Sequence, residues 1–495
     1  SRPDPETSPM TPTRTFALAI ALGAATPTAA ADLTPRGLFD LWQDQAAEQG
    51  RTVTAQAVED GAEGLALRGL EVEQVLDDTT FAATIPLLTL RQTDAGVTAT
   101  LASGQAITVT VTEADTPPTT ARLDVREGPL TLTASGAAPS PDYAVAAEAF
   151  ALDLAALDGP DVPGDAAWSM GLAGLAGTLA GGSGGDPLTA DLTLARLSTD
   201  LAATDPATGG TFATSVAQNA MTAALALVPA ASGGDWAFDL RTASGPSTTL
   251  SRQTDPESGT IETESRQAST RLSMALRDGR ATYASTATGL DLVVRADGLP
   301  VPQAEFSAAA ADLALSLPTE PGPDPQAARL QADIEALTAN EAVWDMLDPG
   351  GALPRGPATV VVDLGGDVVV GDAAATAEMP DGLPDVLPRT LDIETLSLDF
   401  AGAEIDAEGA FTLRSGADGA PDLSAPPVGA LTVTGRGITE FLGQLIAGGM
   451  VTQEQAMGMQ MMLGMFATQR PDGALETRIV TTEEGGIEIN GNRIR

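Results

Sequence analysis

The densest cluster of one chemically distinctive residue type is a run of methionines near the end of the chain. Half of the twelve methionines fall between Met450 and Met465. Methionine is flexible and polarizable, so a surface of this kind can accept varied apolar ligands or a protein partner. We therefore predict a site here for an apolar or amphipathic ligand. The predicted ligand-binding residues are Met457, Met461, Met462, Met465, Phe466 and Phe441.

Two other interpretations of these methionines stay open. Methionine at helical spacing usually fills a core, so the side chains could pack under a sheet. Thioethers are also soft ligands for copper. The chain has no histidine or cysteine to complete a copper site, however. We predict no cofactor and no bound metal.

Carboxylates offer a different candidate chemistry. A glycosidase needs two of them flanking the scissile bond, one held in an apolar pocket that raises its pKa. The candidates are two short groups of aspartates: Asp158, Asp161 and Asp165, and Asp345 and Asp348. The first group could instead hold calcium, although its spacing is not that of an EF-hand. Solvated loop charge explains both groups, so we assign no catalytic residue and keep a carboxylate-dependent glycan hydrolase as an alternative function.

Missing residue types exclude several chemistries. The chain has no histidine, no cysteine and no lysine, so all 25 basic residues are arginine. Without histidine there is no Ser-His-Asp triad. Without cysteine there is no thiol nucleophile, disulfide or thiolate zinc site. Without lysine there is no P-loop cation and no Schiff base. The sequence therefore favours a protein that is not an enzyme.

The charge balance limits the partners. The formal net charge is −42 and the isoelectric point is near 4.1. Nucleic-acid binding needs clustered cations to replace condensed counterions, so we predict no nucleic-acid partner. A dense carboxylate surface stays solvated in salt, and a structural acidic protein adapted to salt is therefore a further alternative function.

The N-terminal stretch has the pattern of a secretory signal peptide. After an apparent upstream extension, residues 1–9, come a positive n-region at Arg14, an apolar h-region over 16–25 and an A-x-A cleavage signal that ends at Ala31. The h-region is too short to span a bilayer, and no later stretch supplies about eighteen uninterrupted apolar residues. We therefore expect a signal peptide over 10–31 and a periplasmic mature chain without a transmembrane segment.

Hydrophobic periodicity predicts a mainly β chain of the α+β class. A helix is expected over Leu33–Gln49, capped by Thr34, and from there the period changes to two in short segments bounded by glycine, proline and aspartate. This pattern predicts an elongated antiparallel β-meander with a few short helices, two of them packed near the C-terminus. The proline-rich stretch 318–325 separates an N-terminal β-rich region, 32–320, from a C-terminal region of hairpins and Met-rich helices, 325–495.

Several local expectations are specific. Thr359–Val370 should form a hairpin that turns at its two adjacent glycines. Thr242–Gln267 is rich in serine, threonine and charge, and should be an exposed turn or long loop. Near the C-terminus, Thr439 should cap one helix, and Thr452 with Gln455 should form the capping box of the next.

Four segments carry a family resemblance. They are Glu341–Pro349, Leu353–Arg355, Glu454–Gly458 with the methionines that follow, and the terminal Ile489–Arg495. Together they resemble the exported alphaproteobacterial family catalogued as domain of unknown function 2125, over essentially the whole mature chain. That family has no established activity, so the resemblance implies a compartment and an architecture but no catalytic residues.

A weaker similarity is to AsmA-like and YdgA-like envelope proteins. It lies in hairpins such as Leu396–Leu398 followed by Gly402–Glu404, and in the closing Asn490-Gly491. The similarity implies a long curved sheet, and some of those proteins are thought to carry lipids. Our hypothesis is a non-enzymatic exported β-rich protein that binds a lipid, another amphiphile or an envelope protein along a groove closed by the Met-rich helices.

Overall fold

The computed structural model describes residues 33–494 except 63, 77–78, 115, 161, 164, 182–186, 229–236, 372–385, 415 and 417–424. The expected upstream extension, signal peptide and cleavage site therefore lie outside the described residues, as does Asp161.

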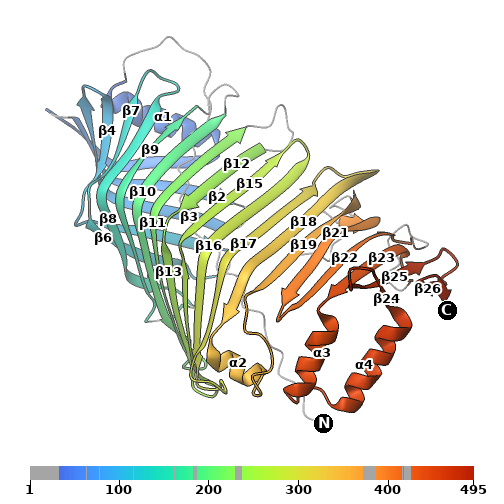
Figure 1. The fold of residues 1–495 in the computed structure, drawn as a ribbon. Coiled ribbons are helices and arrows are strands. Elements are labelled where there is room, and N and C mark those ends of the chain that lie inside the picture. Colours follow the sequence, from blue (N-terminus) through green and yellow to red (C-terminus); the bar gives the residue numbers. More distant parts are fainter. Residues whose placement is uncertain are drawn as a thin grey trace.

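All strands in the described part of the chain belong to one antiparallel sheet of 27 strands (Figure 1), which confirms the mainly β prediction. Its first half consists of β1 (Arg51–Gly61), β2 (Gly64–Leu76), β3 (Thr79–Thr93), β4 (Gly96–Leu101), β5 (Ala106–Glu113), β6 (Thr119–Glu127), β7 (Leu130–Ser135), β8 (Asp142–Asp158), β9 (Ala167–Ala180), β10 (Leu188–Thr204), β11 (Thr211–Val228), β12 (Ala237–Ser244), β13 (Ser247–Asp255) and β14 (Gly259–Gln267). The second half consists of β15 (Ser269–Arg277), β16 (Arg280–Ala296), β17 (Ala304–Pro318), β18 (Gly322–Ala339), β19 (Ala358–Val370), β20 (Val386–Pro388), β21 (Thr390–Phe400), β22 (Ala403–Thr412), β23 (Val428–Arg436), β24 (Thr468–Gln469), β25 (Leu475–Thr481), β26 (Ile487–Ile489) and β27 (Asn492–Arg493). The helices are α1 (Pro35–Glu48), α2 (Glu341–Leu347), α3 (Ile438–Ala447) and α4 (Gln453–Phe466).

The strand order contains the same six-strand arrangement twice. In the first module, β3–β8, the long strand β3 pairs with both β4 and β5, these pair with β7 and β6, and both of those pair with the long strand β8. In the second module, β11–β16, the same pairings connect β11 to β12 and β13, then to β15 and β14, and finally to β16. Long unbroken strands separate the two modules, so the sheet runs through both without a break.

A line of small residues, which we call the crease, crosses the sheet from β9 to β18 and so runs through the second module. At Gly174, Ala220, Gly289 and Ala336 the strand adopts φ between +50° and +63°. The register shows that these positions lie opposite one another through small neighbours such as Ala195. An extra left-handed residue bulges a strand, bends it and shifts which face its side chains occupy. A Cβ added at Gly174 would meet the Cβ of Ala195 on β10, and one added at Gly289 would meet the Cβ of Ala268 between β14 and β15, each at 2.8 Å, so glycine is required there.

The closed end of the sheet is at the N-terminus, where α1 packs on β1, β2 and β3. Thr34 caps α1 through its hydroxyl, as predicted, and Pro35 begins the helix. Leu38 and Phe39 of α1 share a core with the buried side chains of Leu67, Leu90, Val97, Ala134 and Tyr143. A second cluster joins Leu101, Val125, Ala147 and Phe150 to partly buried residues of β3 and β9. The sheet therefore curls far enough for β3 and β9 to contribute to one core (Figure 1).

Three local expectations are confirmed or corrected. Thr452 with Gln455 forms the predicted capping box of α4, and Asn340 caps α2. The cap of α3 is Gly437, not Thr439, because a left-handed glycine ends β23 and starts the helix directly. The predicted hairpin over Thr359–Val370 is wrong, since this segment is the single strand β19. A Cβ at Gly366 would meet the carbonyl oxygen of Thr390 at 2.3 Å, so glycine is needed for the two strands to approach this closely.

The stretch Thr242–Gln267 was expected to be a turn or long loop, and that is also wrong. It contains the end of β12 and all of β13 and β14. Opposite charges lie directly across these strands, as with Arg252 and Glu262 at 3.0 Å, and cross-strand pairs of this kind stabilise a sheet even when the sequence is polar. Sheet pairing also continues through the expected boundary, because β17 pairs with β18 on either side of it.

Candidate functional site

The two faces of the sheet can be told apart from the core clusters. Leu172, Leu175 and Leu179 of β9 pack against the buried residues of the closed end, and the face that carries them is called the inner face. Residues directly opposite each other in an antiparallel pair point to the same side. The register therefore extends the inner face from β9 across the rest of the sheet.

The inner face is apolar and uncharged along its rows. One row, starting at Leu179, contains Ala190, Leu225, Leu240, Met274, Tyr283, Leu315, Leu330, Leu364 and Ile393. The next inner row contains Leu192, Ala223, Thr242, Leu272, Ser285, Leu313, Ala332, Val362 and Leu396. The row between them, which faces the other way, carries Asp191, Arg241 and Asp363. Charge is thus confined to the outer face along these strands.

Many large side chains of the inner face are exposed. The exposed fraction is 41% for Leu313, 36% for Leu330 and 43% for Leu396, and these three side chains lie on neighbouring parts of β17, β18 and β21. The exposed apolar residues of the second module on the same face are Phe212, Ile261 and Leu292. A soluble protein rarely leaves so extended an apolar surface uncovered unless something binds there. The inner face is therefore the candidate functional site.

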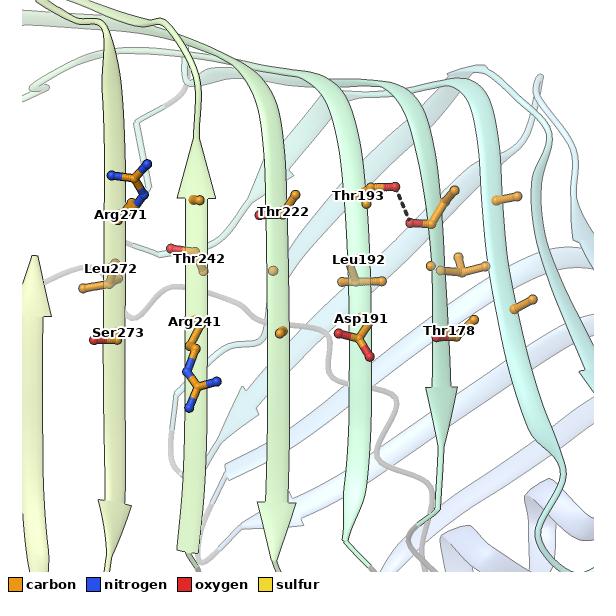
Figure 2. Close-up of a pocket in the computed structure, with 18 of the residues that line it drawn as sticks. Thr178, Asp191, Leu192, Thr193, Thr222, Arg241, Thr242, Arg271, Leu272 and Ser273 are labelled. Carbon is orange, nitrogen blue, oxygen red and sulfur yellow. Dashed lines mark hydrogen bonds between the residues drawn. The ribbon is translucent and has the colours of Figure 1, made fainter. Parts of the chain in front are cut away.

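A hollow of about 940 Å³ lies on the opposite, outer face, across strands β8 to β16 (Figure 2). Its walls are mostly alanine, serine and threonine, and its ionisable residues are Asp191, Arg241 and Arg271. Arg241 is already held by Asp239 at 2.9 Å. The Thr193 hydroxyl donates to the Ala176 carbonyl at 3.1 Å, so it has no base beside it. This hollow therefore contains no acid–base pair of the kind hydrolysis needs.

On the outer face, ion pairs between arginine and carboxylate side chains connect neighbouring strands. The carboxylates in these pairs stay ionised. Arg329 binds Asp363 through two nitrogens, at 2.9 and 2.6 Å. The hydrogen bonds from this guanidinium lower the pKa of Asp363. Such a pair fixes β18 to β19 and keeps a charge in water on the side away from the inner face.

The predicted carboxylate candidates do not assemble into a pair. Asp165 accepts hydrogen bonds from the hydroxyl and the backbone N–H of Thr204, which lower its pKa, whereas a general acid needs a raised one. Asp345 is exposed and binds Arg355 at 3.0 Å. Asp348 is fully buried and accepts the Leu353 N–H at 2.7 Å, which stabilises the turn after α2. Asp158, at the end of β8, is exposed.

The predicted methionine site lies away from the inner rows, on α4. The exposed fractions are 60% for Met457, 64% for Met461, 59% for Met462 and 64% for Met465. The alternative that these four pack as core is therefore wrong. Phe466 is half-buried at the end of α4. Phe441, on α3, packs with Trp344 and Phe400 in a small aromatic cluster, with ring centroids of Phe400 and Phe441 6.3 Å apart.

One pattern in the sequence marks the inner face. Leucines alternate with charged or hydroxyl residues in β10, β15 and β17, and this alternation marks one apolar face per strand. Alternation cannot show whether that face is covered. Within the described ranges, no cluster of three or more carboxylates suits a metal, and no helix is long and apolar enough to cross a bilayer.

Comparisons with models of known protein families, with curated proteins and with solved structures find no match to this chain.

Proposed function

We propose that this chain is an exported, non-enzymatic envelope protein that binds the acyl chains of a lipid or a similar amphiphile on the inner face of its sheet. The observation that carries the proposal is the separation of charge from apolar surface. The inner rows from β9 to β21 lack Asp, Glu and Arg, although the chain has 67 acidic and 25 basic residues. A side of a sheet kept free of charge, yet exposed, suits hydrocarbon rather than a polar substrate.

The chemistry of acyl chains fits this surface better than that of a sugar or peptide. Sugar and peptide sites need converging polar groups to satisfy hydroxyls and amides. The inner rows offer few such groups, such as Thr242 and Ser285. An extended hydrocarbon chain needs only a continuous apolar strip of protein surface to bind. The length of the sheet provides that strip, because the rows continue from strand to strand without an interrupting charge.

Export and family membership belong to the same proposal. They are supported by the signal-peptide pattern over 10–31 and by the resemblance of Glu341–Pro349 and Ile489–Arg495 to domain of unknown function 2125. A periplasmic location suits the proposed ligand, since envelope lipids are present there. Arginine rather than lysine throughout, and no cysteine, are compatible with this setting.

The test is mass spectrometry of small molecules extracted from the purified chain, expressed with export. We expect phospholipid or another amphiphile in the wild type and a loss of most of it in the variant Leu313→Glu, because a carboxylate on the inner face must be desolvated by a bound chain. The matched control is Ala314→Glu, the next residue of β17, which points to the outer face.

Two results would contradict the proposal. One is a wild-type protein that carries no amphiphile and takes up none from micelles. The other is equal loss in the two variants while both stay folded, which would mean that the amphiphile does not bind specifically on the inner face. Circular dichroism of both variants shows whether they stay folded.

A further inference from the structure

Helix α4 exposes nearly all of its apolar surface. From Met457 to Phe466 it has no charged residue, and its first turn carries only Glu454. Five of its methionines are exposed, including Met459 at 44%. Only Ala456 is buried, while Leu463 and Phe466 are half-buried. Figure 1 shows α3 and α4 extending away from the ends of the strands, so this surface is free of the sheet.

The exposed methionines cover a wide sector of the helix. With about 100° between successive residues, Met457, Met461 and Met465 follow one side, and Met462 and Met459 continue around it. The sector is about 200° wide, whereas a helix that lies in a protein groove needs an apolar stripe of only about 100°. A surface this wide is covered more completely by a fluid apolar phase than by a rigid groove.

The ends of α4 are fixed, so the helix is formed without a covering partner. Thr452 and Gln455 make reciprocal hydrogen bonds at its start. At its end the Phe466 carbonyl accepts from the Thr477 hydroxyl at 3.1 Å and from the Asn490 side chain at 2.7 Å. These bonds tie α4 to β25 and to the turn after β26. The exposed methionines are thus presented on a rigid support.

We propose that α4 docks the protein on a lipid bilayer, lying in the headgroup boundary of a membrane rich in zwitterionic lipid. Its 14 residues span about 21 Å, which is shorter than the hydrocarbon core of about 30 Å, so the helix lies in the interface and does not cross. The charge of the helix and of the whole chain favours zwitterionic over anionic lipid. The helix has no Lys or Arg to attract anionic headgroups, and the whole chain carries −42. The contact goes beyond ligand binding on the inner face and stands without it.

The test is flotation of the full chain with protein-free vesicles. We expect wild-type protein to float with phosphatidylcholine vesicles, and to float less when anionic lipid is mixed in. Replacing Met461 and Met462 together by glutamate should lower the floating fraction by roughly tenfold or more, because both carboxylates must then enter the interface. Replacing the same two residues by leucine should preserve it, since leucine keeps the apolar surface.

Two other outcomes would contradict the proposal. A wild type that floats with no protein-free vesicle, but binds envelope extracts, identifies a protein partner instead. Loss of flotation in the leucine variant as well as in the glutamate variant identifies thioether chemistry, such as a soft metal ion. The Leu313→Glu variant separates this contact from the proposed function, because it should lose bound amphiphile and still float.

Discussion

The first module, β3–β8, and the second module, β11–β16, repeat the same strand pairings, yet their inner faces are buried to very different degrees. In the first, Leu90 and Val97 have no exposed surface. In the second, Phe212, Ile261 and Leu292 on the same face are 40%, 47% and 37% exposed. Both modules are built from similar lengths of chain, residues 79–158 and 211–296. The difference is what lies on them, because α1 and β2 cover only the first.

This difference separates two roles that one fold can have. In the first module the apolar face is a core, and its burial stabilises the closed end of the sheet. In the second module the same kind of face is exposed, and we propose that an amphiphile binds there. Backbone pairing holds the second module together, since each of its strands pairs with neighbours on both sides. The comparison predicts that changes of equal size will have unequal effects in the two modules.

The largest difference is expected for leucine truncation. Leu90→Ala should lower the free energy of unfolding by about 2–5 kcal/mol, because it leaves a cavity in a closed core. Leu292→Ala should cost less than about 1 kcal/mol, because its side chain is already more than a third exposed. Urea unfolding of both variants, purified without ligand, measures the contrast. A loss above about 2 kcal/mol for Leu292→Ala would mean that something in the protein covers the second module.

Ligand should act in the opposite direction. A bound amphiphile stabilises whatever it covers, by about 2.7 kcal/mol when its concentration is a hundredfold above the dissociation constant. We expect slower amide hydrogen exchange in β11–β16 on adding phospholipid micelles, and little change in β3–β8. The Leu313→Glu variant serves as the control. Equal protection of both modules would show that the ligand binds the closed end or both faces, and would remove the functional side of the comparison.

Much of the architecture could be predicted from period-two patterning, but the pairing could not. Alternation in β10 or β17 identifies a strand and its apolar side. It does not show that β3 pairs with both β4 and β5, because that depends on which loops let a long strand receive two partners. The sequence also could not predict that the inner face is exposed. Leu90 is buried and Leu292 is exposed, although both lie in similar local patterns.

The methionines of α4 show the same limit. Their helix and its capping box are local features, and both were predicted. Whether Met461 would pack against the sheet depends on the angle at which α3 leaves β23. That angle is set by the left-handed Gly437, whose Cβ would meet the Gly402 carbonyl oxygen at 2.1 Å. A contact between segments far apart in the chain therefore decided the exposure of the helix.

The crease gives an intermediate effect that can be reversed. Gly289→Ala puts a side chain on a left-handed residue and against the Cβ of Ala268, 2.8 Å away, and should cost about 2–3 kcal/mol. At another crease position, Ala220 has φ 50° and lies opposite Gly245, so alanine is tolerated where its neighbour is glycine. Adding Ala268→Gly to Gly289→Ala should therefore restore part of the lost stability.

The control for this pair lies outside the crease. Gly209 also has positive φ, but a Cβ there would meet nothing within 4 Å, so Gly209→Ala should cost only about 1 kcal/mol. Thermal unfolding of the three variants measures the order. If Ala268→Gly gives no rescue, the close approach across the crease is not what requires glycine.

The smallest effect is expected at the two tyrosines of the chain, which lie on corresponding long strands. Tyr143 of β8 is buried in the first module and accepts a hydrogen bond from the Trp42 indole at 3.2 Å, whereas Tyr283 of β16 is half-buried on the inner face. Tyr143→Phe removes that bond and should cost about 0.5–1.5 kcal/mol near neutral pH. Urea unfolding measures it.

Burial of Tyr143 also makes the closed end sensitive to alkali. Desolvation raises the pKa of its phenol from 10.0 to about 12, with a smaller opposing effect from Trp42. The unfolded chain then releases this proton near pH 10, while the folded chain keeps it until about pH 12, so stability falls as the pH rises through that window. In a Tyr283→Phe background Tyr143 is the only phenol, and tyrosinate absorbance reports its ionisation directly. If the phenol ionises close to pH 10 while the protein stays folded, the first module is open to water, and its contrast with the second module is lost.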